Sequence, residues 1–260
     1  MLASMNHPNI VGFRAAQRLS DGHLCLALEH CEASLYSFIQ ERVKPDRGCV
    51  SPTREARAGA VFTPAEVHRI GKCIASGLSY LHNTHHLMHG DVKSANILCS
   101  RDLARVKICD LGVSIPLKHD LSACSDHHYE GTEPWRPPET LLQSEGDFCN
   151  PDATAQEGEA EGLRLCDRTD IFAFGLVLWE MLSGDVPHAA KLAAGDEAYR
   201  KSLGTRPPLP PLPKSYDRLE RIFRCCTQRE CDRRPSAIEL EDWLAPEDSE
   251  NRREPPSDIL

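Results

Sequence analysis

Apolar residues in several parts of the chain fall in short runs that predict β-strands. Residues 11–17 and 23–28 form one pair of runs, joined at Asp21-Gly22, a dipeptide typical of hairpin turns. Residues 97–99 and 106–109 form a second pair, flanked by polar turns. Both pairs are therefore predicted to be antiparallel hairpins.

Elsewhere the apolar residues recur at helical spacing. Residues 33–41 carry apolar side chains on one face, and residues 63–85 begin with T-P-A-E, in which threonine can cap, proline suits the first helical position and glutamate completes a capping box. Residues 167–184 are apolar nearly all round, which predicts a buried central helix. Two further helices are expected at residues 216–227 and 236–244.

Polar segments interrupt this pattern. Residues 42–60 are rich in Arg, Gly and Pro and are predicted to be a surface loop. Residues 142–166 are acidic with few large apolar residues, which predicts a disordered insertion, the alternative being a specific surface for a partner. Residues 247–260 are charged and are predicted to be a disordered tail.

Length and charge exclude some classes of protein. The chain has 260 residues, 40% hydrophobic and 27% charged, which is ordinary for a globular protein of one large or two small domains. The formal net charge of −9 argues against a nucleic-acid groove. The longest apolar run, residues 171–182, contains Glu180 and is too short to span a bilayer. We therefore expect neither nucleic acid nor a membrane as a partner.

Cysteines and histidines are both plentiful. The chain has 12 cysteines but no C-x-x-C and no secretory signal at the N-terminus, so we expect reduced thiols in a cytoplasmic or nuclear protein. His82, His85, His86 and His89 form a cluster that could be a zinc site or the end of a helix entering a loop. No cysteine or carboxylate completes a site at ligand spacing, which favours the helix end.

Candidate chemistry lies in residues 89–112, H-G-D-V-K-S-A-N-I-L-C-S-R-D-L-A-R-V-K-I-C-D-L-G. The hairpin predicted here would bring Asp91, Asn96 and Asp110 to one edge. Phosphoryl transfer needs such a set, because a carboxylate orients the attacking hydroxyl and oxygen ligands hold Mg²⁺. The alternative is that Asp91 and Asp110 are merely turn-forming aspartates.

The pattern H-x-D-x-K-x-x-N followed by D-x-G resembles the catalytic loop and metal-binding turn of eukaryotic protein kinases. The resemblance implies ATP and Mg²⁺ as cofactors and a protein substrate. It further implies that Asp91 accepts or orients the substrate hydroxyl proton, and that Lys93 neutralises charge on the phosphoryl group. Asn96 and Asp110 would hold Mg²⁺, and His89 would support the loop.

This stretch also departs from the kinase pattern. Gly90 stands where most kinases have Arg, and Leu111 where most have Phe. Without that Arg, a phosphate on the activation segment lacks its usual partner. Lys93 at the second position after Asp91 resembles the Ser/Thr kinases.

Other segments extend the resemblance. H-P-N-I-V at residues 7–11 is similar to the link into the fourth strand of a kinase N-lobe. The resemblance makes Leu28 the gatekeeper and places a hinge that pairs with adenine, including Glu29 and Cys31, at residues 29–31. It implies an α+β, protein-kinase-like fold, mostly the helical C-lobe at 32–246, with only the last two N-lobe strands at 1–28.

Residues 131–139, G-T-E-P-W-R-P-P-E, resemble the end of a kinase activation segment. Thr132 would then hydrogen-bond Asp91 and Lys93 and help to select Ser/Thr substrates. Asp170 would accept backbone N–H groups of the catalytic loop, and Arg234 would form a buried pair with Glu139. Candidate phosphorylation sites in this region are Ser122, Ser125, Tyr129 and Thr132.

No G-x-G-x-x-G precedes His7, and there is no room for the kinase strand lysine. We therefore expect either a natural start upstream or a shortened form with an impaired nucleotide site. Two functions stay open: a Ser/Thr or dual-specificity protein kinase, or a catalytically inactive protein-binding module.

Three motifs narrow the resemblance: H-G-D, G-T-E-P-W, and D-E-A-Y with L-G-T-R-P-P. Together they are similar to the T-lymphokine-activated killer cell-originated protein kinases, or PDZ-binding kinases, a family related to the MAP kinase kinases and associated with mitosis. A PDZ-domain partner could bind the C-terminal Leu260, the alternative being a frayed terminus.

Overall fold

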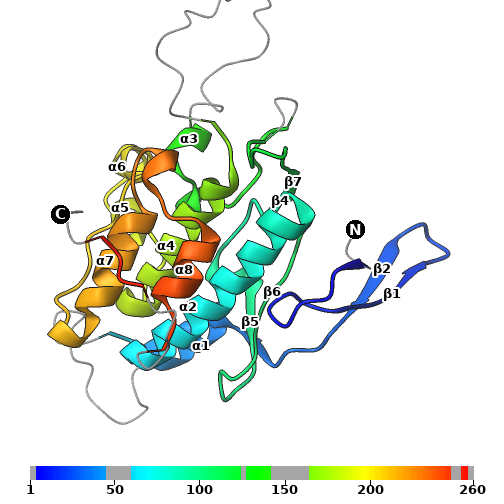
Figure 1. The fold of residues 1–260 in the computed structure, drawn as a ribbon, viewed down its shortest axis with the longest axis horizontal. Coiled ribbons are helices and arrows are strands. Elements are labelled where there is room, and N and C mark those ends of the chain that lie inside the picture. Colours follow the sequence, from blue (N-terminus) through cyan, green and yellow to red (C-terminus); the bar gives the residue numbers. More distant parts are fainter. Residues whose placement is uncertain (1–3, 45–59, 124–126, 142–163, 247–252, 257–260) are drawn as a thin grey trace, which may run out of the picture.

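The chain folds into a helical body with a small two-stranded sheet projecting from one side (Figure 1). This computed structural model describes residues 4–44, 60–123, 127–141, 164–246 and 253–256. The mixture of helices and small sheets confirms the α+β class. Most of both predicted insertions, most of the tail and Leu260 lie outside the described residues.

The projecting sheet is the first predicted hairpin. Strands β1 (Phe13–Arg18) and β2 (Leu24–Leu28) pair antiparallel, and the turn between them contains Gly22 at φ +90°. Every residue of β2 is exposed, including Leu24 at 60%, Leu26 at 51% and Leu28 at 40%. Side chains two residues apart lie on the same face of a strand, so these leucines form one exposed apolar row.

The second predicted hairpin lies inside the helical body. Strands β5 (Ile97–Cys99) and β6 (Val106–Ile108) pair antiparallel, and β3 (Ala33–Ser34) adds to the outer edge of β5. A separate pair is formed by β4 (Leu87–Met88) and β7 (Ile115–Pro116). The hairpin fixes the two ends of the candidate motif, because Asn96 immediately precedes β5 and Asp110 follows β6.

The predicted helices are all present. The structure forms α1 (Leu35–Val43), α2 (Pro64–Ser79), α4 (Asp167–Ser183), α7 (Asp217–Cys226) and α8 (Ala237–Trp243). Shorter helices are α3 (Pro138–Leu141), α5 (Ala189–Leu192) and α6 (Asp196–Ser202). None of the helices in the described segments combines the length and apolarity needed to cross a bilayer.

Helix α4 is the centre of the core. Phe172, Phe174 and their neighbours are buried on every side of the helix, because α2, α7 and the catalytic-loop region pack around it. Gly184 ends the helix in the left-handed conformation at φ +75°, which glycine adopts without strain. Helix α2 has the expected capping box between Thr63 and Glu66.

The boundaries of the insertions differ from those predicted. Helix α1 continues to Val43, and Arg42 forms a 2.8 Å ion pair with Glu66 while its guanidinium lies 4.0 Å from the centre of the Phe62 ring. Cys166 caps the start of α4 and forms a β-bridge with Ser122. Local sequence predicts loops for these residues because their partners lie far away in the sequence.

Glu139 and Arg234 form a fully buried ion pair that joins α3 to the chain before α8. Two guanidinium nitrogens of Arg234 lie 2.6 and 2.7 Å from the two carboxylate oxygens of Glu139, and neither side chain is exposed. Arg234 also donates to the backbone oxygens of Arg168, Gln228 and Arg229. The pair therefore ties three segments of the chain together.

Replacing Arg234 with Met tests this role. Removing one partner leaves the Glu139 carboxylate buried without its charge partner, and we expect the free energy of unfolding to fall by roughly 3–5 kcal/mol. Arg233→Met is the matched control, since that neighbouring side chain is exposed and the change should stay within about 0.5 kcal/mol. Equal losses in urea denaturation of the two variants would contradict the assignment.

Candidate active site

Asp91 is at the centre of a dense hydrogen-bond cluster. Its Oδ1 accepts from the backbone N–H of Thr132 at 2.9 Å and from the Thr132 hydroxyl at 2.6 Å. Its Oδ2 lies 2.7 Å from the Lys93 ammonium and accepts from the Asn96 amide at 2.9 Å. Lys93 also donates to the Thr132 hydroxyl at 2.6 Å. The structure thus brings Asp91, Lys93, Asn96 and Thr132 together.

These donors keep Asp91 ionised. Burial by itself would raise the pKa of the carboxyl, but the hydrogen bonds from Lys93 and Thr132 outweigh it and hold the pKa below its ordinary value. Asp91 is therefore a carboxylate at neutral pH. It can accept a hydrogen bond from an incoming hydroxyl and orient that group.

Asn96, which contacts Asp91, and Asp110, whose neighbour Cys109 donates to the Asn96 backbone carbonyl oxygen at 2.9 Å, offer oxygen ligands. The Asn96 amide nitrogen donates to both the backbone and the carboxylate of Asp91, which directs its carbonyl oxygen the other way. Asp110 is exposed, has φ +64°, and accepts from the Gly112 N–H at 3.2 Å. Hard oxygen donors of this kind suit Mg²⁺, so the residues present fit that ion.

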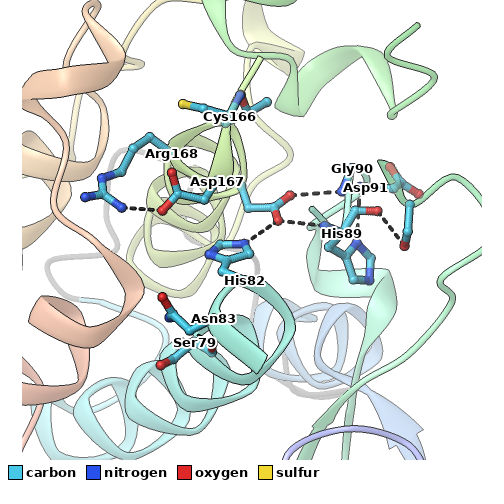
Figure 2. A network of polar contacts seen from close by, with 12 residues as sticks. Ser79, His82, Asn83, His89, Gly90, Asp91, Cys166, Asp167 and Arg168 are labelled. Carbon is cyan, nitrogen blue, oxygen red and sulfur yellow. Dashed lines mark hydrogen bonds and ion pairs between the residues drawn. The ribbon is translucent and has the colours of Figure 1, made fainter. Parts of the chain in front are cut away.

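Asp170, in the first turn of α4, anchors the catalytic loop by accepting hydrogen bonds from its backbone. One carboxylate oxygen accepts from the His89 backbone N–H at 2.7 Å and lies 2.8 Å from His82 Nε2, while the other accepts from the Gly90 N–H at 2.9 Å. Figure 2 labels His82, His89 and Gly90, the three residues that contact this carboxylate. Asp170 is 1% exposed, so it acts as a structural support for the loop.

His89 links the two ends of the motif. Its Nδ1 accepts from the Asp91 backbone N–H at 3.1 Å, so that nitrogen carries no proton. Its Nε2 faces the carbonyl oxygen of Cys109 at 3.0 Å and must therefore be the donor. A neutral His89 thus ties the residue next to Asp110 to the loop that carries Asp91. His82 contacts Asp170 and His89 joins the two ends of the motif, so both imidazoles form hydrogen bonds within the protein.

Gly90 and Gly131 allow the activation segment to lie directly on the catalytic loop. Gly90 has φ +80°, and a Cβ there would lie 2.8 Å from the Val113 carbonyl oxygen. A Cβ on Gly131 would lie 2.4 Å from the Gly90 carbonyl oxygen. The absence of a side chain at Gly90 is therefore required by the backbone packing, which explains one departure from the kinase pattern.

Comparison with known proteins agrees with this geometry. The family model described as "Protein kinase domain" matches residues 1–243 of this chain. The chain belongs to the protein kinase family. Within that family it is 36% identical to the lymphokine-activated killer T-cell-originated protein kinase of Homo sapiens, over 94% of this chain and 72% of that protein.

Mitogen-activated protein kinase kinase kinases are also similar to this chain. The zak-1 kinase of Caenorhabditis elegans is 31% identical over 72% of this chain, and kinase 12 of Rattus norvegicus is 28% identical over 90% of it. This chain spans only 22% of the length of each of these two relatives.

The expected hinge of this kinase lies between the projecting sheet and the body. Leu28 ends β2, and the Glu29 carboxylate accepts from the Gly12 N–H at 3.1 Å and pairs with Lys107 of β6 at 3.0 Å. The Cys31 thiol is half-buried, and burial raises its pKa. In the described part of the chain no hydrogen bond joins Leu28, Glu29 or Cys31 to Asp91.

Most of the candidate phosphorylation sites face inward in this structure. Tyr129 is 7% exposed, and burial raises the pKa of its hydroxyl. Ser122 is 5% exposed and its hydroxyl donates to Asp120 at 2.6 Å. The Thr132 hydroxyl is bonded to Asp91. Ser122 and Tyr129 are therefore buried in this structure, Ser125 lies outside the described residues, and phosphorylation at these positions stays a prediction.

Glu180 supports the site through buried hydrogen bonds, although no sequence motif marks it. Its buried carboxylate accepts from the Ser94 hydroxyl at 2.5 Å, the Ser94 N–H at 3.3 Å and the Trp135 indole N–H at 2.9 Å. It thus connects α4 to both the catalytic loop and the activation segment. The only available signal was one acidic residue inside an otherwise apolar helix.

Glu180 should make stability depend on pH near neutrality. Burial raises the pKa of its carboxyl to about 7, partly offset by the hydrogen bonds from Ser94 and Trp135. The folded chain then holds a proton that the unfolded chain releases above its ordinary pKa of 4.5. Protonation of Glu180 therefore stabilises the folded state. This stabilisation is fully present below pH 4.5 and is lost as the pH rises to about 7.

We expect the wild-type free energy of unfolding, relative to that of Glu180→Gln, to fall by about 3 kcal/mol across this pH window. The glutamine variant cannot titrate at this position, so it supplies the reference at each pH. Urea denaturation at several pH values between 4.5 and 8 measures the difference. Parallel curves for the two proteins would show that Glu180 has no raised pKa.

Proposed function

We propose that this chain is an ATP- and Mg²⁺-dependent protein kinase that phosphorylates Ser/Thr hydroxyls, with dual specificity as the broader form of the same activity. The observation that carries the proposal is the Asp91 carboxylate, held between Lys93 and Thr132 beside Asn96. A role restricted to binding has no need of this arrangement.

Each residue then has a defined role. Asp91 orients the substrate hydroxyl and accepts its proton as the oxygen attacks the γ-phosphorus of ATP and the bond to the leaving ADP oxygen breaks. Lys93 stabilises the negative charge on the transferred group. Asn96 and Asp110 would hold Mg²⁺, which neutralises phosphate charge when bound. Leu28, Glu29 and Cys31 would border the adenine.

Thr132 favours aliphatic hydroxyls in this proposal. It holds Asp91 through two hydrogen bonds at the base of the activation segment, and the kinase resemblance gives a threonine here a part in selecting Ser/Thr substrates. The relatives that are mitogen-activated protein kinase kinase kinases support a role in mitogen-activated protein kinase signalling. We place this signalling in mitosis, in the cytoplasm or nucleus, with a PDZ-domain partner at Leu260.

A non-catalytic binding role is the second candidate. The exposed leucine row of β2 favours it, because contiguous apolar surface often marks a site of protein contact. In that case phosphoryl transfer would be absent, while partner binding would depend on the row of Leu24, Leu26 and Leu28.

Substitution of the two aspartates decides between these functions. We expect Asp91→Asn to lower turnover of a Ser/Thr peptide library by roughly 10²–10⁴-fold while Mg²⁺-dependent binding of an ATP analogue persists. Asp110→Asn should weaken that binding itself. Asp102→Asn is the matched control, because Asp102 lies in the exposed turn between the two motifs and its side chain accepts hydrogen bonds from Ser100 and Ala104 of that turn.

Radiometric transfer from ATP and titration with a fluorescent nucleotide provide the two measurements. Turnover that is the same in wild type and Asp91→Asn would contradict the kinase proposal and favour the binding role. A library in which only tyrosine acceptors are labelled would contradict the Ser/Thr assignment alone.

A further inference from the structure

Two cysteines from distant parts of the chain meet beside helix α4. Cys166 immediately precedes the helix, and Cys231 starts the short 3₁₀ turn Cys231–Arg233. Both residues line the same cavity of about 270 Å³, and each thiol is the largest single influence on the pKa of the other. Cys166 is half-buried and Cys231 is buried. Neither residue takes part in the phosphoryl-transfer site described above.

The surroundings distinguish the two thiols. The hydrogen bond from Cys231 lowers the pKa of the Cys166 thiol, and the Arg168 backbone N–H at the start of α4 adds to this effect. The same hydrogen bond, together with burial, raises the pKa of Cys231. Of the two thiols, Cys166 therefore ionises more readily. Thiolates, rather than thiols, are the nucleophiles in sulfur chemistry.

The fold already holds the partner segments together. Arg234, three residues after Cys231, donates to the backbone oxygen of Arg168, two residues after Cys166, at 3.0 Å. The Cys231 thiol also lies 3.6 Å from the Arg164 carbonyl oxygen, to which it can donate. A bond between the two sulfur atoms would therefore join segments that are adjacent in the folded state.

We propose that Cys166 and Cys231 form a reversible disulfide in response to a peroxide, which makes this pair an oxidation site of the kinase. The Cys166 thiolate attacks one peroxide oxygen, the O–O bond breaks, and Cys166 becomes a sulfenic acid while hydroxide leaves as water. Cys231 then attacks that sulfur, the S–S bond forms, and a second water leaves. Two thiols are oxidised and one peroxide is reduced to two waters.

The disulfide would act on the scaffold of the site. Cys166 is four residues from Asp170, which anchors the catalytic loop, and Cys231 is three from Arg234, which pairs with Glu139. The cross-link covalently fixes the start of α4 to the segment before α8. Because the cross-link closes a long loop of chain and matches the folded arrangement, the oxidised protein should unfold at a higher temperature.

Peptide mapping of the full chain tests the proposal directly. Reduced protein is treated with hydrogen peroxide, alkylated and digested, and the expected product is a cross-linked peptide pair containing Cys166 and Cys231, reversed by dithiothreitol. Oxidation of Cys166 should be roughly tenfold faster than that of Cys73, since a thiolate reacts and a thiol does not. Cys73 is also half-buried, but burial raises the pKa of its thiol.

Variants separate the two steps. In Cys231→Ser, oxidation should stop at a sulfenic acid on Cys166, which dimedone traps. Cys166→Ser should form neither the sulfenic acid nor the cross-link. Cys73→Ser should form the cross-link as the wild type does. Equal alkylation rates for Cys166 and Cys73 in the wild type, with no cross-linked pair, would overturn the proposal and need no variant. A lower melting temperature after oxidation would also overturn it.

Discussion

The buried carboxylate of Asp170 is the interaction on which the site depends. It sits in the first turn of a helix that is buried throughout, and it accepts from two backbone N–H groups and contacts one imidazole. Burying a carboxylate costs free energy unless such donors satisfy it. If the catalytic loop moved away from α4, the Asp170 carboxylate would lose its donors and the folded state would be destabilised. The loop conformation that presents Asp91 follows from this constraint.

A second set of contacts links the loop to the activation segment and again to α4. Thr132 bonds to Asp91, and Trp135 reaches the Glu180 carboxylate that also binds Ser94. The catalytic loop is therefore clamped between α4 and the activation segment. Because Glu180 and Asp170 lie on the same rigid helix, one element positions both the loop and the segment that covers it.

Local patterns predicted much of the fold. The capping box at Thr63, the Asp21-Gly22 turn and the 97–109 hairpin each depend on residues close together in the sequence. The residues now gathered around Asp91 were identified through the kinase resemblance. Glu180 was missed because its partners, Ser94 and Trp135, are 86 and 45 residues away. The inward position of Tyr129 likewise depends on distant contacts, and burial cannot be deduced from one residue type.

The exposed leucine row on β2 also has a consequence for the order in which the structure opens. A two-stranded sheet is marginally stable by itself in water, and here one strand of the pair is exposed along its whole length. The backbone amides of β1 and β2 should therefore exchange their hydrogens with solvent at a lower opening free energy than those of α4. Local opening of this ribbon would leave the contacts around Asp91 intact. The two-stranded sheet and the helical body should therefore open with different free energies.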